Sequence, residues 1–276
     1  MAAFNYRPVV VAFVALVVNG GAVGTASAQV EKMDEVAGKT PAAPAMQHNR
    51  GPKRLALSNA DGAVITLWKP DLGKRELEPK MGMITLPPTG VDNYHAIVVE
   101  RDWGSAVDAI VRYEYMRGKP SGESPVKLLS AVKTPVEIVP DPLPREHHRY
   151  YSRAEATFIL RYKDQVLTNH PVMLQTGNGS SLNRVSDSQG RVVFQIPDDF
   201  SDVVPGERDR RGAELSVSTE YQADGVQYNS ALTAEYRVSP EHWQSKPWGV
   251  AVAGIGFVFG GFLTRRVARN KKGGAK

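Results

Sequence analysis

Cysteine is absent from the 276-residue chain, and histidine is scarce, with six residues in all. The chain therefore has no disulfides, no thiol nucleophile and no thiolate metal ligands, and its stability must come from core burial or a bound ligand. A glycine-rich phosphate loop, an H-E-x-x-H motif and a G-x-S-x-G elbow are also missing. Asp198 and Asp199 form a carboxylate pair in a predicted turn, but no adjacent base or oxyanion donor supports general acid/base catalysis there. The sequence thus predicts that the protein is not an enzyme.

Residues 1–28 have the composition of a secretory signal peptide. Arg7 supplies the positive charge near the start, Val9 to Val18 is a short apolar run, and Ala26-Ser27-Ala28 is a small-x-small cleavage site. We therefore predict cleavage before Gln29 and export of the mature chain. The alternative is an uncleaved N-terminal anchor, which the shortness of the apolar run disfavours.

The C-terminal part of the sequence predicts a membrane anchor. Trp248 to Leu263 is apolar and uncharged, and because a helix needs about twenty residues to cross a bilayer, we predict a transmembrane helix over residues 245–264. Trp243 precedes this helix, Trp248 lies near its start, and a basic tail, residues 265–276, follows it, so the positive-inside rule places the tail in the cytoplasm. The body is then periplasmic and anchored in the inner membrane. Gly256 and Gly260 form a G-x-x-x-G spacing that would allow a homodimer, unless glycine is simply common in this segment.

The formal net charge of +5 belongs to the two ends of the chain and not to its body. Without the one arginine of the signal peptide and the six cations after Thr264, the exported body carries a formal charge of −2. A net positive charge would favour binding to nucleic acid or to an anionic surface, but in this chain the cations of the tail indicate the orientation of the predicted transmembrane helix. We therefore expect no nucleic-acid partner.

The body alternates short runs of β-branched and aromatic residues with turn residues, a pattern typical of antiparallel β-sandwiches. Val192, Phe194 and Ile196 alternate with polar neighbours, as in a strand with one buried face. Asp187 to Gly190, just before this run, has the composition of a type I turn and predicts a β-hairpin there. Other strands are predicted over residues 63–68, 82–86, 94–102, 106–116, 127–139, 156–162, 171–176, 215–221 and 228–238.

These strands predict a mainly β protein with two antiparallel, Ig-like or prealbumin-like sandwich domains in series. A flexible leader over residues 29–53 precedes the first domain, residues 54–139. A proline-rich connector, residues 140–153, leads to the second domain, residues 154–240. The alternative is one mixed sandwich that contains a proline-rich crossover.

The histidines supply the candidate metal ligands. His95 follows Asp92 at the start of a predicted strand, where an imidazole and a carboxylate would suit a divalent transition metal as cofactor. His147 and His148 follow the connector, but neighbouring residues of an extended chain point to opposite sides. If His95 met one of them, a site for Cu²⁺, Ni²⁺ or Zn²⁺ would form. The alternatives are a buried His95 bonded to a loop carbonyl and a solvated connector.

Residues from Glu155 to Val238, above all His170-Pro171-Val172 and the run from Ser186 to Phe194, resemble the carboxypeptidase-regulatory-like and Ig-like modules of exported bacterial proteins. The exported body as a whole resembles a DUF4198-like family of periplasmic proteins, some of which accompany nickel and cobalt uptake systems. Members of that family often begin their mature chain near a metal-binding histidine, whereas Gln29 takes that place here.

Two functions fit these features. The first is a membrane-anchored, non-catalytic periplasmic binding or accessory module that hands a transition metal such as nickel, cobalt or copper to a membrane transporter. The second is a structural or protein-interaction module of the cell envelope that binds no small ligand.

Overall fold

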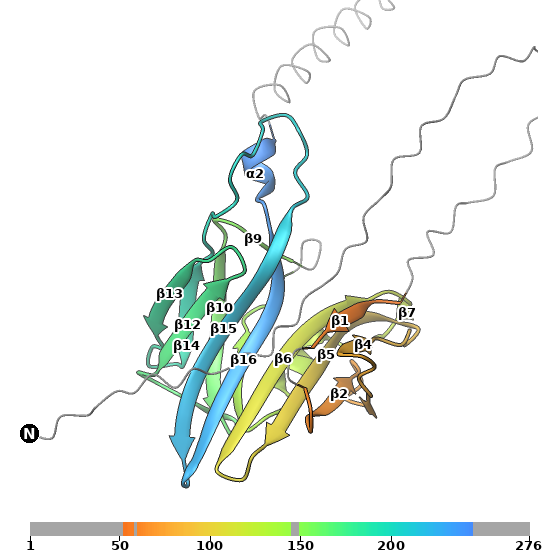
Figure 1. Cartoon of the computed structure of the whole chain (residues 1–276), viewed down its shortest axis with the longest axis vertical. Helices are drawn as coiled ribbons and strands as arrows, with labels where there is room; N and C mark the ends of the chain where they lie inside the picture. The colour runs from red at the N-terminus through yellow and green to blue at the C-terminus, as the bar shows by residue number, and fades with distance from the viewer. Residues whose placement is uncertain (1–51, 58–59, 145–148, 245–276) are drawn as a thin grey trace, which may run out of the picture. The chain divides into compact units, whose positions relative to one another are not determined.

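The structure is a computed structural model that describes residues 52–57, 60–144 and 149–244. The predicted signal peptide, nearly all of the leader, His147, His148, the predicted transmembrane helix and the tail lie outside these described residues. Within the described ranges, no helix has the length and apolar character needed to cross a membrane. Strands predominate in the described residues, as predicted and as Figure 1 shows. Two short helices, α1 (Pro125–Ser130) and α2 (Pro240–Trp243), accompany them there.

The chain divides into two compact units, and each unit takes up separate pieces of the sequence. The first unit contains the described residues up to Ile138, with Arg161–Gln165 and Thr219–Thr233. The second contains Val139–Leu160, Val166–Ser218 and the described residues from Ala234 onward. The two units are therefore interleaved along the chain. The short turn at Arg161–Gln165 and the hairpin tip at Thr219–Thr233 belong to the first unit, although the segments before and after them belong to the second.

The main sheet of the first unit is built on one long antiparallel hairpin. β5 (Val91–Asp102) pairs with β6 (Ala106–Met116) along almost their whole length. β2 (Val64–Trp68) pairs with β5, and β3 (Lys74–Glu76) pairs with β2. On the other side β16 (Val226–Arg237) runs parallel to β6, from Gln227 beside Ala106 to Thr233 beside Arg112. The short β7 (Lys119–Pro120) pairs with the start of β5.

One face of this sheet carries the apolar core of the first unit. The strands bury alternate residues on it, as the period of two requires. A separate two-stranded sheet, β1 (Arg54–Ala56) paired with β4 (Met83–Thr85), contributes to the same cluster. The fully or nearly fully buried members include Leu55, Ile65, Leu67, Ile84, Ile97, Val99 and Ile110.

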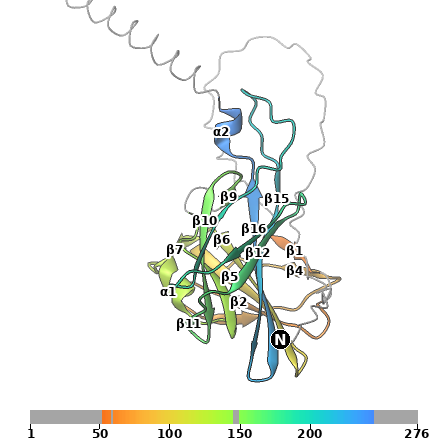
Figure 2. The ribbon, with the colours of Figure 1, turned by 90° about the vertical axis from the view of Figure 1, so that its left-hand side faces the viewer.

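A helix replaces the start of a predicted strand in the first unit. The sequence predicted a strand over residues 127–139, but α1 (Pro125–Ser130) occupies the first part of it, and β8 (Val136–Pro140) begins only after Pro135. The reason is local: the hydroxyl of Ser124 accepts a hydrogen bond from the Val126 backbone N–H, and Pro125 is the first helical residue. α1 buries Leu128 and packs against β5 (Figure 2).

The second unit contains two groups of paired strands. In the first group, β12 (Pro171–Thr176) lies between β13 (Ser181–Val185) and β15 (Gly212–Ala223), antiparallel to both. In the second, β10 (Glu155–Tyr162) pairs with β14 (Arg191–Gln195). Both groups bury one side of their strands, as in a β-sandwich; the buried residues are Ala156, Phe158, Leu160, Val172, Leu174, Val192, Phe194, Leu215 and Val217.

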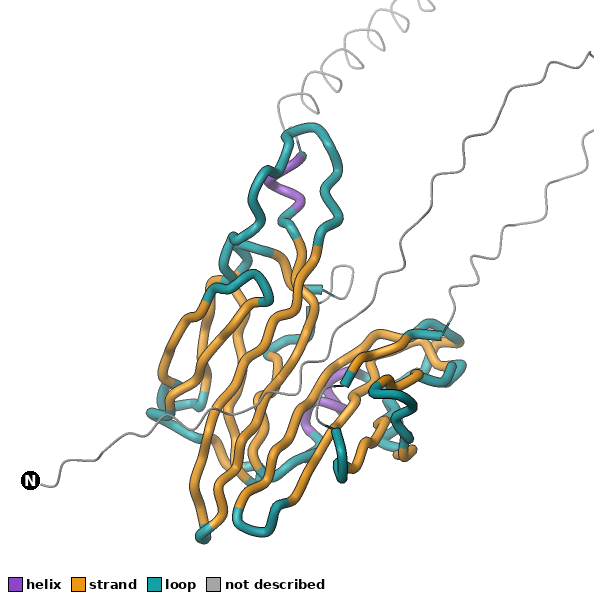
Figure 3. Tube along the Cα trace, viewed as in Figure 1, coloured by secondary structure: helices purple, strands orange, loops and turns teal. Residues whose placement is uncertain are grey.

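Short elements complete the fold. β9 (Tyr150–Tyr151) pairs with the end of β16, and α2 (Pro240–Trp243) follows β16. β11 (Gln165–Val166) pairs with β10 after the tight turn at Lys163 and Asp164. Figure 3 shows these strands with the loops and turns that join them.

The predicted turn at Asp187 to Gly190 is confirmed, but the predicted hairpin is wrong. The Gly190 N–H donates to the Asp187 carbonyl over 3.0 Å, and the Asp187 carboxylate accepts from the backbone N–H groups of Gln189 and Arg191. Before the turn, β13 pairs with β12; after it, β14 pairs with β10. The turn thus carries the chain from one sheet to the other. Turn residues fix the reversal of the chain, whereas the buried faces of the strands decide which strands pair.

Replacing Gly190 with alanine should destabilise the protein more than replacing Gly206. Both glycines have a positive φ, +71° and +93°, which costs an L-residue about 1–2 kcal/mol. A Cβ on Gly190 would also lie 2.8 Å from Val166 Cβ and 2.9 Å from the Leu160 carbonyl oxygen, whereas a Cβ on Gly206 meets nothing within 4 Å. We expect an extra loss of about 1–3 kcal/mol for Gly190→Ala in urea unfolding of the full-length protein. Equal losses in the two variants would contradict this account.

Candidate functional site

The predicted metal ligands that the structure describes do not converge. His95 lies within β5 and is fully buried, with Nδ1 3.1 Å from the carbonyl oxygen of Asn93. Asp92 is three positions earlier on the same strand, so it projects from the opposite face, where it interacts with Tyr115. In the parts of the chain that the structure describes, no three His, Asp or Glu side chains are grouped to hold a metal ion. His147 and His148 lie outside those parts, so their predicted role stays a prediction.

His95 belongs to a buried polar row on the core face of the first unit. It lies opposite Glu114 in the β5–β6 register, and Glu114 accepts from the Arg112 guanidinium at 2.6 Å and from the Lys53 ammonium. Burial alone would raise the pKa of Glu114, but Arg112 and Lys53 outweigh it and hold that pKa below its usual value. Burial lowers the pKa of His95, although the Asn93 carbonyl acts in the opposite direction. The environment of this row therefore favours the ionised form of Glu114 and the neutral form of His95.

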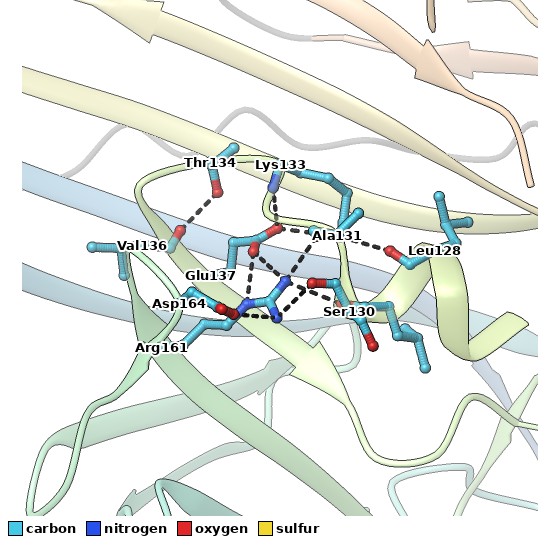
Figure 4. A network of polar contacts seen from close by, with 10 residues as sticks. Leu128, Ser130, Ala131, Lys133, Thr134, Val136, Glu137, Arg161 and Asp164 are labelled. Carbon is cyan, nitrogen blue, oxygen red and sulfur yellow. Dashed lines mark hydrogen bonds and ion pairs between the residues drawn. The ribbon is translucent and has the colours of Figure 1, made fainter. Parts of the chain in front are cut away.

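A second buried network surrounds Glu137 at the end of α1 (Figure 4). Its carboxylate is 1% exposed and lies 2.6 Å from an Arg161 terminal nitrogen and 3.3 Å from the Lys133 ammonium. The Arg161 guanidinium also donates to the carbonyls of Leu129 and Ala131, and Lys133 donates to those of Leu128 and Ala131. Burial lowers the pKa of Lys133, and Glu137 acts against that shift. These bonds fix residues 161–165 to the α1–β8 connection, which makes the network structural.

The carboxylates of Asp198 and Asp199 have separate partners in the second unit. Asp199 accepts from the hydroxyls of Tyr236 and Thr176, each at 2.5 Å. Burial would raise the pKa of Asp199, but these two hydrogen bonds lower it below its usual value. Asp198 instead lies 2.6 Å from the Arg153 guanidinium and 3.4 Å from His242 Nδ1. The two carboxylates therefore bond to different groups and do not converge on one point.

Two groups of exposed or half-buried aromatic and polar side chains lie at the ends of hairpins in the first unit. Trp103, in the β5–β6 turn, is 54% exposed and is the one aromatic residue of the exposed class in the described ranges. The Arg101 guanidinium stacks 3.6 Å from the centre of its ring, and its Nε1–H donates to Asp108 at 2.8 Å. Asn229 of β16 donates to the other Asp108 oxygen at 2.7 Å and accepts from Gln227 at 3.3 Å. We call Arg101, Trp103, Asp108, Gln227 and Asn229 the Trp103 ledge.

Three tyrosines form a second exposed group, which we call the tyrosine patch. The Tyr162 ring lies 5.0 Å from that of Tyr221 and 5.6 Å from that of Tyr228. The Tyr162 hydroxyl donates to Asp224 at 3.1 Å, and the Lys163 ammonium lies 3.3 Å from the same carboxylate. All five side chains are half-buried or exposed, at the tip of the β15–β16 hairpin and the adjacent β10–β11 turn.

Sequence reasoning did not single out either group. Trp103 and Asn229 of the ledge lie far apart in the chain and meet only because β16 pairs in parallel with β6. Tyr162 of the tyrosine patch is likewise distant in sequence from Tyr221 and Tyr228, which it contacts at the tip of the β15–β16 hairpin. The one local signal was Trp103 itself, between the turn residues Asp102 and Gly104, which is an unusual place for a large apolar side chain.

No protein-family model matches the chain, and no curated protein matches it in sequence. Among solved structures, a segment of two fibronectin type-III domains from chicken tenascin shares 12% identity over 68% of this chain and 95% of that chain, with a TM-score of 0.22. The SGBP-B protein of a Bacteroides ovatus mixed-linkage glucan utilization locus was solved with a mixed-linkage heptasaccharide. It shares 13% sequence identity over 68% of this chain and 41% of that chain, with a TM-score of 0.20. A Ca²⁺-stabilised adhesin with which an Antarctic bacterium binds ice shares 11% sequence identity over 70% of this chain and 44% of that chain, with a TM-score of 0.24.

The chain thus spans less than half the length of the last two of these structures, at 41% and 44%. TM-scores of 0.20 to 0.24 establish neither a shared function nor a shared family. The resemblance of the exported body to periplasmic proteins that accompany metal uptake stays a prediction of the sequence.

Removing the charge of Glu137 should unfold the first unit far more readily than removing that of Asp164, which contacts the same arginine. Glu137→Gln leaves the buried Lys133 without a counter-charge and Arg161 with only the exposed Asp164, which costs about 3–5 kcal/mol. The Asp164 side chain is 66% exposed and 3.4 Å from Arg161, so Asp164→Asn should cost at most about 1 kcal/mol. Urea unfolding of both full-length variants measures the difference. A loss below about 1 kcal/mol for Glu137→Gln would show that the network is dispensable.

Any stabilisation of the full-length protein by Ni²⁺, Co²⁺, Cu²⁺ or Zn²⁺ should be independent of His95. A metal at a hundredfold excess over its dissociation constant stabilises the folded state by about 2.7 kcal/mol, a measurable rise in the unfolding midpoint. Because His95 is fully buried and faces no group of ligands, the rise should be the same in His95→Ala as in the unchanged protein. The comparison variant is the double change His147→Ala and His148→Ala. A rise that survives in this double variant but is lost in His95→Ala would overturn the prediction.

Proposed function

We propose that the protein is a membrane-anchored, non-catalytic interaction module of the cell envelope, and that it contacts its partner through the hairpin ends of the first unit. The observation that carries the proposal is the Trp103 ledge. A tryptophan that is 54% exposed is held in one orientation by a stacked guanidinium and a hydrogen bond to Asp108. Rigid, half-open aromatic and arginine side chains are the groups that most often anchor a binding partner.

The bonding of the acidic residues supports a non-catalytic role. Glu114 and Glu137 are each neutralised by two cations, and Asp199 accepts from two hydroxyl groups. A general base needs a lone pair directed at its substrate, whereas these carboxylates are turned toward structural partners. These three acids thus contribute to stability, whereas the Trp103 ledge offers aromatic and amide groups suited to recognition.

The place of the module in the cell is proposed from its sequence. The predicted signal peptide would export the body, and the predicted helix over residues 245–264 would hold it at the inner membrane, directly after α2. A tethered module of this kind binds an envelope component at a high effective concentration. Delivery of a transition metal to a transporter, the other function that fits the sequence, depends on histidines outside the described residues and is decided by the metal measurement above.

Site-specific photo-crosslinking in intact cells tests the proposed contact. A photoreactive phenylalanine analogue at Ser105, an exposed residue of the β5–β6 turn, should give light-dependent adducts with an envelope component. The control position is Val193, a 44% exposed residue on the outer side of β14 in the second unit. We expect the Ser105 adduct to be at least several times stronger than that at Val193. Equal adducts at the two positions, or none at Ser105, would overturn the proposal.

A further inference from the structure

We propose that the Trp103 ledge binds a neutral carbohydrate chain made of β-linked, gluco-configured pyranose rings. The inference rests on the proposed function and names the chemical class of the partner. It is drawn from two features that the ledge combines, an open aromatic face and a connected set of planar polar groups beside it.

The aromatic face matches the apolar side of a sugar ring. In a gluco-configured pyranose the hydroxyl groups are equatorial, so the axial C–H bonds form a flat apolar face. The π face of an indole is negatively polarised and attracts such C–H groups, in addition to burying apolar area. Arg101 covers one face of the Trp103 ring at 3.6 Å, and the residue is still 54% exposed, so we infer that the opposite face is open.

The polar groups beside the ring match the hydroxyl groups at its edge. Asp108, Asn229 and Gln227 form a connected row that begins at the Trp103 Nε1–H. Each Asp108 oxygen accepts one of these bonds and has a second lone pair, and the amides offer both donors and acceptors. A hydroxyl group is both donor and acceptor, so neighbouring equatorial hydroxyls fit such a row better than an ion would.

The ledge is organised before any ligand arrives. The ring is fixed on its edge by Asp108 and on one face by Arg101, and Asp108 is fixed by Asn229 from a different strand. Because these side chains are already ordered, binding would cost less side-chain entropy than at a free surface tryptophan. The residue after Trp103 is Gly104, with φ at +83° and open space around its Cβ position, so it adds no side chain beside the ring.

Saturation-transfer NMR and calorimetric titration of the full-length protein with cellotetraose and tetra-N-acetylchitotetraose test the inference. We expect saturable binding of at least one of them, weakened about tenfold or more by Trp103→Ala. Trp103→Phe keeps an aromatic face and should retain binding, weakened several-fold. Gln227→Ala should weaken binding about two- to fivefold, because it removes one edge contact. Cellotetraose and the chitin fragment distinguish a glucan from an amino-sugar polymer as the source.

The controls make the result decisive. Val193→Ala, outside the ledge, should bind as the unchanged protein does. A β-1,4-linked galactotetraose, in which each axial O4 interrupts one of the two ring faces and bends the chain at the linkage, should bind at least about tenfold more weakly than the gluco-configured chains. Unfolding midpoints of every variant are measured alongside, and if Trp103→Ala is destabilised, the comparison is made with Trp103→Phe.

Three results would overturn the inference: no saturable binding of either oligosaccharide, equal binding of galactotetraose, or binding that neither Trp103 variant changes. The proposed function fails separately. An adduct from Ser105 to a protein, without oligosaccharide binding, removes the carbohydrate and keeps the interaction module. Absence of the Ser105 adduct removes the module itself.

Discussion

The first unit depends on the neutralisation of buried charge by Glu137. This carboxylate is 1% exposed and lies within ion-pair distance of both Lys133 and Arg161. Arg161 also closes the C-terminal end of α1 through the carbonyls of Leu129 and Ala131. Three pieces of chain, the helix, the start of β8 and the turn after β10, are therefore connected by one acid. In a chain without cysteine, these ion pairs and hydrogen bonds connect distant segments of the folded chain, although charge burial also carries a desolvation cost.

Two other acids, the buried Glu114 and the half-buried Asp199, also have structural partners. Glu114 is paired with Arg112 and Lys53, and Asp199 with two hydroxyls, so acids that would suggest chemistry in a sequence serve stability in the fold. The proposed contact with a partner therefore involves surface side chains and not these acids. There the parallel pairing of β16 with β6 brings Gln227 and Asn229 beside Asp108 and Trp103, and the surface they form is the one that we propose for recognition.

Many strands were predictable because, in a strand with one buried face, every second residue is apolar. The strand at Val192, Phe194 and Ile196, the turn at Asp187 to Gly190 and the two long strands β5 and β6 were all predicted from such local patterns. The predictions failed where a choice of partner was needed. β14 pairs with β10 instead of forming a hairpin with β13, and α1 replaces a predicted strand because Ser124 and Pro125 start a helix. Burial of Arg161 was also missed, because an alternating pattern places it among the polar residues.

The sequence by itself determined that the protein is mainly β, because periodicity and turn residues are properties of neighbouring residues. It also limited the candidate metal-ligating histidines to His95, His147 and His148. Only the tertiary structure decided that His95 is buried away from Asp92, and that Trp103, Asp108 and Asn229 form one surface. These are relations between residues on different faces or different strands, and they depend on which strands pair and in which register, which no local pattern of residues specifies.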